Sequence, residues 1–389
     1  MPSKRSSVEM PDNGNRSARP KYKRAVVKVG TTLLTDKADH LNLGLMAMLV
    51  DQIALIRGIG VEVLLVSSGA VAAGRHVLQV SSGSRNIPIN QVLAATGQIR
   101  LMNAYDQLFN SHKISIAQAL ITRKDLTERI GYLNIRNTLL SLLTLGVIPV
   151  INENDVVAVD ELAGEFFGDN DNLSAMVANL VDADLLIMLG EVDGLHTADP
   201  HLDPDAELIS IVECLDAQVE NMGSDSWGNT GIGGMVTKIE AAKIASGSGV
   251  DVFIASGFEQ EAVIRLVNGE QIGTFFPAKR SRLESRERWM LSGLSTKGEI
   301  ILDSGASKAI VSEKRSLLPA GVSQVVGLFQ RGEIVSILDS SGGKIAAGIV
   351  NYSSDELSTI KGHKTCKIDK LLGHHYGDEI VHRSNMVLY

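Results

Sequence analysis

Apolar runs and helical patterns alternate along the first 278 residues of the chain. The apolar runs are short and continuous, which is typical of strands covered on both faces. They lie at residues 24–32, 61–66, 114–120, 147–151, 185–189 and 252–255. Apolar residues recur at helical spacing at 42–58, 71–80, 87–110, 132–145, 173–180, 241–248 and 261–268. This alternation predicts an α/β fold, with a mostly parallel sheet and helices on both of its faces.

The pattern changes after residue 278. Residues 279–288 form a charged connector, and the segments that follow are short and separated by turn residues. Strand-like stretches then recur at 299–302, 325–329, 333–338 and 344–350. A chain of 389 residues is too long for one typical core, so we expect more than one domain. The predicted parts are a disordered extension at 1–23, a large α/β domain at 24–278, a linker at 279–295 and a small, mainly β domain at 296–389.

Composition and charge argue against several classes of protein. The chain is 44% hydrophobic and only 4% aromatic, with 37 glycines, which fits an α/β enzyme better than a β-rich binding module. A formal net charge of -8 does not suit a general polyanion binder. Cys214 and Cys366 are too few and too far apart for a disulfide framework, and no apolar stretch is long enough to span a bilayer. We expect a cytoplasmic protein that does not bind membranes, with Cys214 packed in an apolar segment.

Two dense polar clusters interrupt the hydrophobic pattern. Residues 152–155 read Asn-Glu-Asn-Asp and directly follow the apolar run 146–151, whereas residues 168–174 read Gly-Asp-Asn-Asp-Asn-Leu-Ser. Carboxylates and amides massed after a buried strand are costly to desolvate unless they bind something. At the carboxyl end of a parallel sheet, that partner is usually a ligand. The clusters therefore predict a site for a charged small molecule.

Glycine-containing turns follow two other strand-like runs. Gly30 comes shortly after Lys28 at the end of the first run, and Gly69 follows Ser68 at the end of the second. Glycine lets backbone N–H groups approach an oxyanion closely, and helices that begin after such turns favour anions. The repetition of this feature at several strand ends predicts a phosphate site.

A third glycine-rich stretch, residues 231–238, reads Gly-Ile-Gly-Gly-Met-Val-Thr-Lys. Its spacing fits neither a Walker A loop nor a dinucleotide-binding fingerprint. One interpretation is a loop that feeds a helix and delivers Lys238 to a phosphate. The other is a glycine hinge before an ordinary amphipathic helix, and this stretch alone does not decide between them.

Together these stretches resemble the amino-acid kinase family, and within it the kinases that phosphorylate the side-chain carboxylate of glutamate. The matching stretches are 27–31, 68–74, 149–155, 168–175, 197–200 and 233–238. The resemblance runs from about residue 24 to the end of the chain, where the small domain is similar to a PUA domain. It implies a three-layer αβα sandwich around a mainly parallel sheet, followed by a small, mainly β PUA domain.

The resemblance also implies a reaction, the transfer of the γ-phosphoryl group of ATP to the γ-carboxylate of L-glutamate. This reaction is the first step of proline biosynthesis. Lys28 and Lys238 would flank the moving phosphoryl group, and Asp171 would orient both lysines. Mg²⁺ would bridge the ATP phosphates and keep several waters, so no metal cage built from protein side chains is expected.

Substrate and nucleotide residues follow from the same resemblance. Asp155 suits the ammonium group of glutamate, whereas Ser68 and Asn170 are neutral donors suited to a carboxylate. Asn152 and Asp169 are neighbours with a weaker claim to the substrate. The residues implied in ATP binding are Lys28, Gly30, Gly69, Gly190, Glu191, Ile232, Gly233, Gly234, Met235, Val236, Thr237 and Lys238.

The chain departs from the family pattern on the nucleotide side. Gly190 and Glu191 stand where the family usually has a Thr/Ser-Asp pair, and Ile232 stands where it usually has threonine. Both departures remove a hydroxyl group, but neither touches the two lysines. Phosphoryl transfer therefore remains the expectation.

Alternatives remain at this stage. A different carboxylate or carbamate kinase of the same fold is one, although the cluster at 152–155 and the C-terminal domain argue against it. RNA binding through the PUA domain is another, but residues 296–389 hold eleven Lys/Arg and ten Asp/Glu, which is not the basic footprint of a dedicated RNA binder. The resemblance further implies feedback inhibition by proline, a homodimer or homotetramer, and transfer of the product to glutamyl-phosphate reductase.

Overall fold

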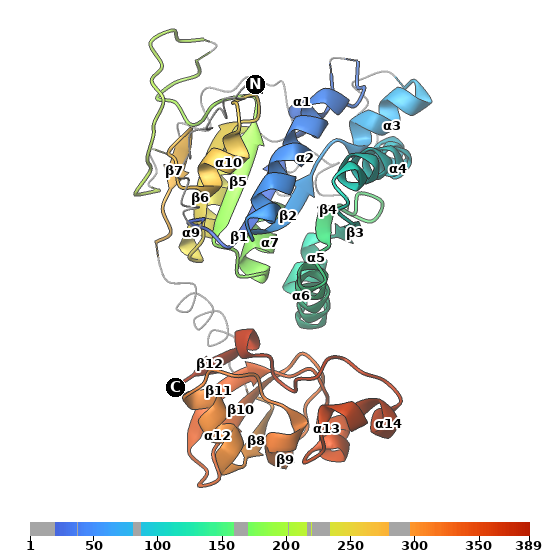
Figure 1. Ribbon diagram of the computed structural model, residues 1–389, viewed down its shortest axis with the longest axis vertical. Helices are drawn as coiled ribbons and strands as arrows, with labels where there is room; N and C mark the ends of the chain where they lie inside the picture. The colour runs from blue at the N-terminus through green and yellow to red at the C-terminus, as the bar shows by residue number, and fades with distance from the viewer. Residues whose placement is uncertain are drawn as a thin grey trace, which may run out of the picture.

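The computed structural model describes residues 20–36, 38–80, 87–158, 170–200, 202–215, 219, 234–279 and 296–389. Most of the predicted extension and all but the first residue of the predicted linker lie outside these residues. The described chain forms two sheets, each with its own helices (Figure 1).

The larger sheet has seven strands in the order β3-β4-β2-β1-β5-β6-β7. Its strands are β1 (Arg24–Val29), β2 (Glu62–Ser67), β3 (Ile116–Ile121), β4 (Ile148–Glu153), β5 (Leu185–Gly190), β6 (Asp251–Ser256) and β7 (Thr274–Phe276). Neighbouring strands run parallel except for β6 and β7, which are antiparallel. This confirms the predicted mainly parallel sheet and adds the edge strand β7. The strands β2, β3 and β4 lie on one side of β1 and the later strands β5, β6 and β7 on the other, so the sheet has a topological switch point beside β1. Such points are where α/β folds usually bind ligands.

The helices cover both faces of this sheet. They are α1 (Thr31–Leu34), α2 (Leu43–Gly58), α3 (Ala70–Leu78), α4 (Ile87–Ser111), α5 (Arg123–Thr127), α6 (Arg129–Thr144), α7 (Asn170–Leu180), α9 (Met235–Gly247) and α10 (Ala262–Val267). Alternate strand residues enter two separate cores: Val27 and Val29 of β1 pack with α2, α4 and α10, whereas Val26 packs with α6, α7 and α9. Burial on both faces explains why these strands are continuously apolar in sequence.

Three local predictions are wrong. The first strand ends at Val29 rather than at Thr32, because residues 31–34 turn into the short helix α1. Tyr22, assigned to the disordered extension, is buried, and its hydroxyl donates to the carboxylate of Asp251 at 2.9 Å. Cys214 is exposed rather than packed.

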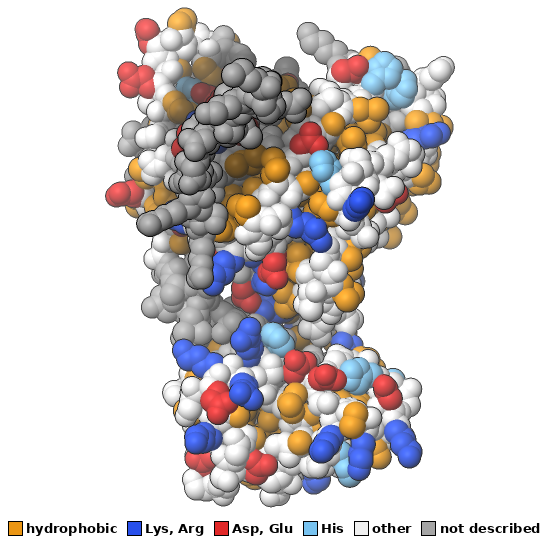
Figure 2. Space-filling view, in the orientation of Figure 1, with side chains coloured by type: hydrophobic (Ala, Val, Ile, Leu, Met, Phe, Trp, Pro, Cys, Tyr) orange, Lys and Arg blue, Asp and Glu red, His pale blue; other side chains and the backbone are white. Residues whose placement is uncertain are grey.

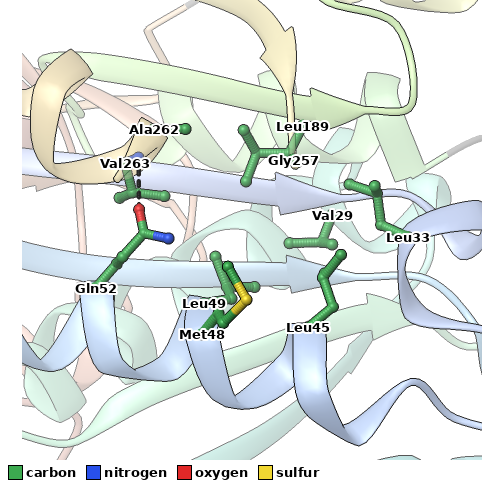
Figure 3. A pocket seen from close by; sticks show the side chains of 10 residues that line it. All are labelled: Val29, Leu33, Leu45, Met48, Leu49, Gln52, Leu189, Gly257, Ala262 and Val263. Carbon is green, nitrogen blue, oxygen red and sulfur yellow. Dashed lines mark hydrogen bonds between the residues drawn. The ribbon is translucent and has the colours of Figure 1, made fainter. Parts of the chain in front are cut away.

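A small apolar cavity lies between α2 and α10 (Figure 3). Its volume of about 10 Å³ leaves room for one water molecule at most. On its wall, the side-chain carbonyl of Gln52 accepts a hydrogen bond at 2.9 Å from the backbone N–H of Val263, in the first turn of α10. This bond satisfies a donor that the helix itself leaves open. The cavity is therefore a feature of packing and is too small for a metabolite.

Helices α3 and α4 cross at very short range because two glycines meet there. A Cβ atom on Gly97 would lie 1.8 Å from the carbonyl oxygen of Ala70, and one on Gly74 would lie 1.8 Å from that of Leu93. Real Cβ atoms do not approach backbone oxygen so closely, so any side chain at either position forces the helices apart. Since α3 begins directly after Ser68 and Gly69, this crossing also fixes the position of the second strand-end turn.

We expect Gly97→Ala to lower the free energy of unfolding by about 2–3 kcal/mol, the usual cost of an added methyl group that a packed core cannot accommodate. The midpoint of urea denaturation measures this change. Gly58→Ala is the matched control, because no atom lies within 4 Å of its Cβ position at the end of α2. Alanine there should be neutral or slightly stabilising. Equal midpoints for the two variants would show that the crossing of α3 and α4 can relax.

The smaller sheet belongs to the C-terminal part of the chain and confirms the predicted mainly β domain. Its strand order is β12-β11-β10-β8-β9. Its elements are β8 (Gly298–Leu302), α12 (Ser304–Val311), β9 (Val322–Gly327), β10 (Ile334–Leu338), β11 (Lys344–Ile349), α13 (Ser354–Ile360), α14 (Ile368–Leu372) and β12 (Met386–Leu388). The face of this domain seen in Figure 2 carries basic and acidic side chains interspersed.

Helix α6 contacts the C-terminal domain. Leu133 joins a small buried cluster with Ile334, Ala347 and Ile349, and the guanidinium of Arg331 donates to Asn134 at 2.7 Å. Among the helices that the structure describes, none has the length and apolar character needed to cross a membrane.

Candidate active site

Four strands of the large sheet end at one edge, and predicted site residues lie at these ends. Lys28 is the last but one residue of β1, Ser68 directly follows β2, Asn152 is the last but one residue of β4, and Gly190 ends β5. These strands are neighbours and run parallel, so their carboxyl ends lie side by side (Figure 1). The sheet thereby gathers residues that are far apart in the sequence.

Strand alternation decides where Lys28 points. Because Val27 and Val29 enter the core under α2, Lys28 faces the opposite side of the sheet, which α7 and α9 cover. There its Nζ lies 2.5 Å from Oδ1 of Asp171. Asp171 sits in the first turn of α7, where the backbone N–H groups of a helix favour a negative charge.

Asp171 joins the two predicted lysines. Its Oδ2 lies 3.2 Å from Nζ of Lys238 and accepts a hydrogen bond of 2.9 Å from the hydroxyl of Thr237, both on the first turn of α9. The side chain of Asp171 is fully buried, that of Lys28 is 4% exposed and that of Lys238 is 13% exposed. The triad of Lys28, Asp171 and Lys238 has a formal charge of +1 in a region shielded from water. Such fixed charge can stabilise negative charge that develops on a transferring group.

The two glycines that follow strand ends, Gly69 and Gly30, differ in whether their surroundings could bind an anion. Gly69 has a φ of 99°, in the region that favours glycine, and caps the N-terminus of α3. The first backbone N–H groups of α3 therefore lie beside Ser68, where a helix N-terminus can bind an anion. The N–H of Gly30, predicted to face a phosphoryl oxygen, instead donates to the carbonyl of Leu189 at 3.3 Å. That bond would have to break or be shared for Gly30 to contact a phosphate.

Three predicted substrate residues form one buried hydrogen-bonded chain. Nδ2 of Asn170 donates to Oγ of Ser68 at 3.0 Å and to Oδ1 of Asn152 at 3.1 Å. Nδ2 of Asn152 in turn donates to Oε1 of Gln98, a residue of α4, at 2.9 Å. No sequence pattern marks Gln98, because a single glutamine within a long amphipathic helix resembles any other polar position.

Asp155 lines an open cavity of about 280 Å³, whose walls also include Glu153 and Gln98, the last residue of the amide chain. Only 9% of Asp155 is exposed, and burial raises the pKa of its carboxyl group to about 6. Among the described residues that line this cavity, two are acidic and none is basic, which suits a ligand with an ammonium group. Asp169, the other predicted substrate residue, lies outside the described residues.

Two residues predicted to bind ATP have inward-facing side chains. The side chain of Met235 packs into the core, and the hydroxyl of Thr237 donates to Asp171, so both side chains make contacts within the protein. Gly234 caps α9, Val236 is half-buried and Glu191 is exposed. A Cβ on Gly190 would lie 3.4 Å from Cε of Lys238, so the lysine stem passes over this glycine. Ile232 and Gly233 lie outside the described residues.

Within the described part of the chain, no group of three or more His, Cys, Asp or Glu side chains is placed to hold a metal ion. The candidate site therefore consists of a buried cationic triad, the N-terminus of a helix that can bind an anion, a chain of hydrogen-bonded amides and an acidic cavity. They suit a reaction that brings a phosphate next to an amino acid.

Comparison with known proteins defines the class. Residues 23–256 match the model of the amino acid kinase family, and residues 298–372 match that of the PUA domain. The chain belongs to the amino acid kinase family, which confirms the resemblance seen in the sequence.

The individual relatives are more specific. A glutamate 5-kinase from Dehalococcoides mccartyi is 52% identical over 367 residues, which cover 94% of this chain and 98% of that protein. A glutamate 5-kinase from Trichlorobacter lovleyi is 46% identical over 366 residues, covering 94% of this chain and 96% of that protein. Among solved structures, a UMP kinase from Bacillus anthracis aligns with a TM-score of 0.48 at 19% identity, over 67% of this chain and 98% of that chain.

Proposed function

We propose that the protein transfers the γ-phosphoryl group of ATP to the γ-carboxylate of L-glutamate and so forms L-glutamyl 5-phosphate, the first intermediate of proline biosynthesis. The observation that carries this proposal is the Lys28–Asp171–Lys238 triad next to the buried amide chain, which reaches the acidic cavity through Gln98. The high identity to glutamate 5-kinases over nearly the whole chain supports glutamate as the acceptor.

The chemistry follows from charge. A carboxylate oxygen of glutamate attacks the γ-phosphorus, the bond from that phosphorus to the β–γ bridging oxygen breaks, and ADP leaves. The attacking carboxylate is already ionised at neutral pH, so no general base is needed. What must be overcome is the repulsion between two anions and their alignment. Lys28 and Lys238 supply fixed positive charge for this purpose, and Asp171 holds both ammonium groups in place.

Mg²⁺ would act through the nucleotide. Both carboxylate oxygens of Asp171 already contact lysine ammonium groups, so the triad offers no free carboxylate to a metal. Mg²⁺ readily binds through substrate phosphates and keeps several of its waters. We therefore infer that ATP, rather than a protein cage, carries the ion, which would neutralise charge on the phosphates.

The acidic cavity would receive the amino end of glutamate. Asp155, buried and facing that cavity, would pair with the ammonium group once ionised. Ser68 would donate its hydroxyl hydrogen to a carboxylate, because its oxygen already accepts from Asn170. Asn170 would offer its oxygen rather than the donor that the sequence suggested, because both hydrogens of its Nδ2 are used within the protein.

The pKa of Asp155 predicts how glutamate binding depends on pH. Since burial raises this pKa to about 6, the carboxyl group is ionised above that value and neutral below it. We expect KM for glutamate to rise as the pH falls below about 6, with a smaller change in kcat at saturating glutamate. Initial rates between pH 5 and 8 would measure this. Asp155→Asn should raise KM above about pH 6, change it little near pH 5 and so flatten the profile; a profile unchanged by this substitution would assign the titration to another group.

The same shift predicts a stability effect in the unliganded protein. A carboxyl group whose pKa is higher in the folded than in the unfolded state destabilises the fold above the folded pKa, and this penalty vanishes below the unfolded pKa of 3.8. Asp155→Asn should therefore increase the free energy of unfolding by up to about 3 kcal/mol at pH 8 and hardly change it near pH 4. Urea denaturation at the two pH values measures the difference, and an equal effect at both would contradict the assignment.

The function is tested by ADP release with Mg-ATP across glutamate, N-acetylglutamate, aspartate and carbamate, with hydroxylamine present to trap an acyl phosphate. Hydroxamate formed from glutamate alone is the expected result. Activity only with another acceptor would keep the fold and move the function to a sister kinase.

The remaining expectations rest on the same function. We propose that proline inhibits by competing with glutamate, and inhibition that persists unchanged at saturating glutamate would contradict an overlapping site. We also propose a cytoplasmic homodimer or homotetramer that passes its labile acyl phosphate to glutamyl-phosphate reductase. The interspersed charges on the visible face of the C-terminal domain do not favour RNA as its main partner (Figure 2).

A further inference from the structure

Gln98 is a polar residue on a face of α4 that is otherwise buried and apolar. Its neighbours on that face are Leu93, Ala94, Gly97 and Leu101. Only 9% of Gln98 is exposed, and its Oε1 accepts a hydrogen bond from Asn152 while the residue also lines the cavity of Asp155. A buried amide of this kind costs stability unless it forms well-placed hydrogen bonds, so its hydrogen-bonding partners indicate what it does.

A single backbone group determines how these amides are oriented. The backbone N–H of Glu153 lies 2.9 Å from the side chain of Asn152, and an N–H can only donate. The atom of Asn152 that faces it must therefore be the oxygen, which leaves Nδ2 on the other side. Because Nδ2 can only donate, Gln98 must present its own oxygen to it, as observed at 2.9 Å.

Asn170 is oriented by the same hydrogen bonds. Asn170 also faces the oxygen of Asn152, so the atom it presents must be Nδ2, and this nitrogen donates to Ser68 as well. Both hydrogens of Nδ2 are then used, and Oδ1 of Asn170 is buried without a hydrogen-bonding partner among the described residues. Ser68, which accepts from Asn170, keeps its hydroxyl hydrogen to donate.

We propose that Gln98 is a positioning residue that stabilises the orientation of Asn152 set by the N–H of Glu153, and with it the arrangement of acceptors and donors in this site. By holding Nδ2 of Asn152, it keeps Oδ1 of Asn170 available to accept from an ammonium group and leaves the hydroxyl of Ser68 to donate to a carboxylate. Gln98 acts through Asn152 and does not need to touch the substrate. This inference rests on the proposed function and deepens it, because it makes Gln98 a determinant of the preference for a free amino group.

Glutarate provides the discriminating probe, because it has both carboxylates of glutamate but no amino group. Gln98→Met keeps the length of the side chain and removes the oxygen that accepts from Asn152. We expect this variant to lower kcat/KM for glutamate by about 10- to 30-fold, mainly through KM, as for the loss of one buried hydrogen-bonding partner. If glutarate is phosphorylated, its kcat/KM should change by less than about 3-fold. If it is not turned over, its inhibition constant as a competitor of glutamate should change by less than about 3-fold. KM for ATP should not move.

Two further variants separate positioning from packing. Gln98→Glu retains an oxygen that accepts from Asn152 in either protonation state, so it should preserve the preference for glutamate over glutarate to within about 3-fold of the wild type. Gln107→Met makes the same chemical change at an exposed position of α4 and should leave the kinetic constants for both glutamate and glutarate unchanged. If Gln98→Met does not fold, Gln98→Asn, which withdraws the same oxygen by one methylene, takes its place with the same expectation.

Equal losses for glutamate and glutarate in Gln98→Met would overturn the proposal, because a packing defect does not distinguish the two. A preference as strong as that of the wild type would overturn it as well. Failure of the proposed function is a different result, since the wild type itself would then give no hydroxamate from glutamate.

Discussion

Lys28→Ala is expected to lower kcat by about 1,000-fold while changing KM for glutamate by less than about 3-fold. The reason is that the ammonium group of Lys28 is fixed 2.5 Å from Asp171 at the end of the central strand, where the phosphoryl group would pass. A preorganised charge that acts on the transition state more than on the bound substrate raises kcat rather than affinity. Losses of this order are typical when a fixed charge or donor is removed from a transferring group. Lys238→Ala should show the same pattern.

Steady-state kinetics with glutamate and Mg-ATP varied separately would measure these effects. Lys243→Ala is the matched control, since Lys243 lies on α9 with Lys238 but is exposed to solvent. Its kcat should stay within about 2-fold of the wild type. A reversed pattern, in which Lys28→Ala mainly raises KM for glutamate and leaves kcat intact, would place Lys28 in substrate binding instead.

Asp171→Asn is expected to have the second large effect, on stability as well as on catalysis. The change is isosteric, but it removes the only acidic member of the triad and leaves Lys28, which is 4% exposed, beside a neutral amide. Removing one partner of a buried ion pair typically costs about 3–5 kcal/mol, because the other charge stays buried without compensation. The midpoint of urea denaturation should fall accordingly, and kcat should fall with it because neither lysine is then held in place.

The double variant Asp171→Asn/Lys28→Met tests the cause of this loss. If the uncompensated ammonium group is responsible, removing it as well should restore much of the stability while activity stays lost. A double variant no more stable than Asp171→Asn would show that Asp171 stabilises the fold by another route, such as its bond with Thr237. Asp106→Asn, at an exposed position of α4, controls for the substitution itself and should be neutral.

The sequence predicted the large sheet well because its signal is local. Continuous apolar runs separated by helical spacing reflect burial on both faces, and six of the seven strands followed from this pattern. The short strand β7, with three residues and no hydrophobic alternation to mark it, did not. The clusters at strand ends also marked the site, because carboxylates and amides placed after buried strands are too costly to keep without a role.

The sequence could not assign roles within the site. Thr237 and Met235 belong to a glycine-rich stretch that suggested nucleotide contacts, yet helix α9 turns both side chains inward. Gly30 lies in a turn whose residues are typical of a phosphate-binding loop, yet its N–H donates to the carbonyl of Leu189 on the neighbouring strand. These outcomes depend on how helices and strands are rotated about their axes, which composition does not record.

By itself, then, the sequence determined the class of fold and the family, because strand period, turn chemistry and motif spacing are properties of neighbouring residues. It also singled out Lys28, Lys238 and Asp171, whose side chains the structure brings together. Only the tertiary structure brought Gln98 of α4 to Asn152, Asn170 and Ser68. It also decided that Gly74 and Gly97 must be glycines and that Asp155 is buried enough to shift its pKa. Hydrogen-bond direction, close approach and desolvation all arise between residues distant in the chain, so they exist only once the chain has folded.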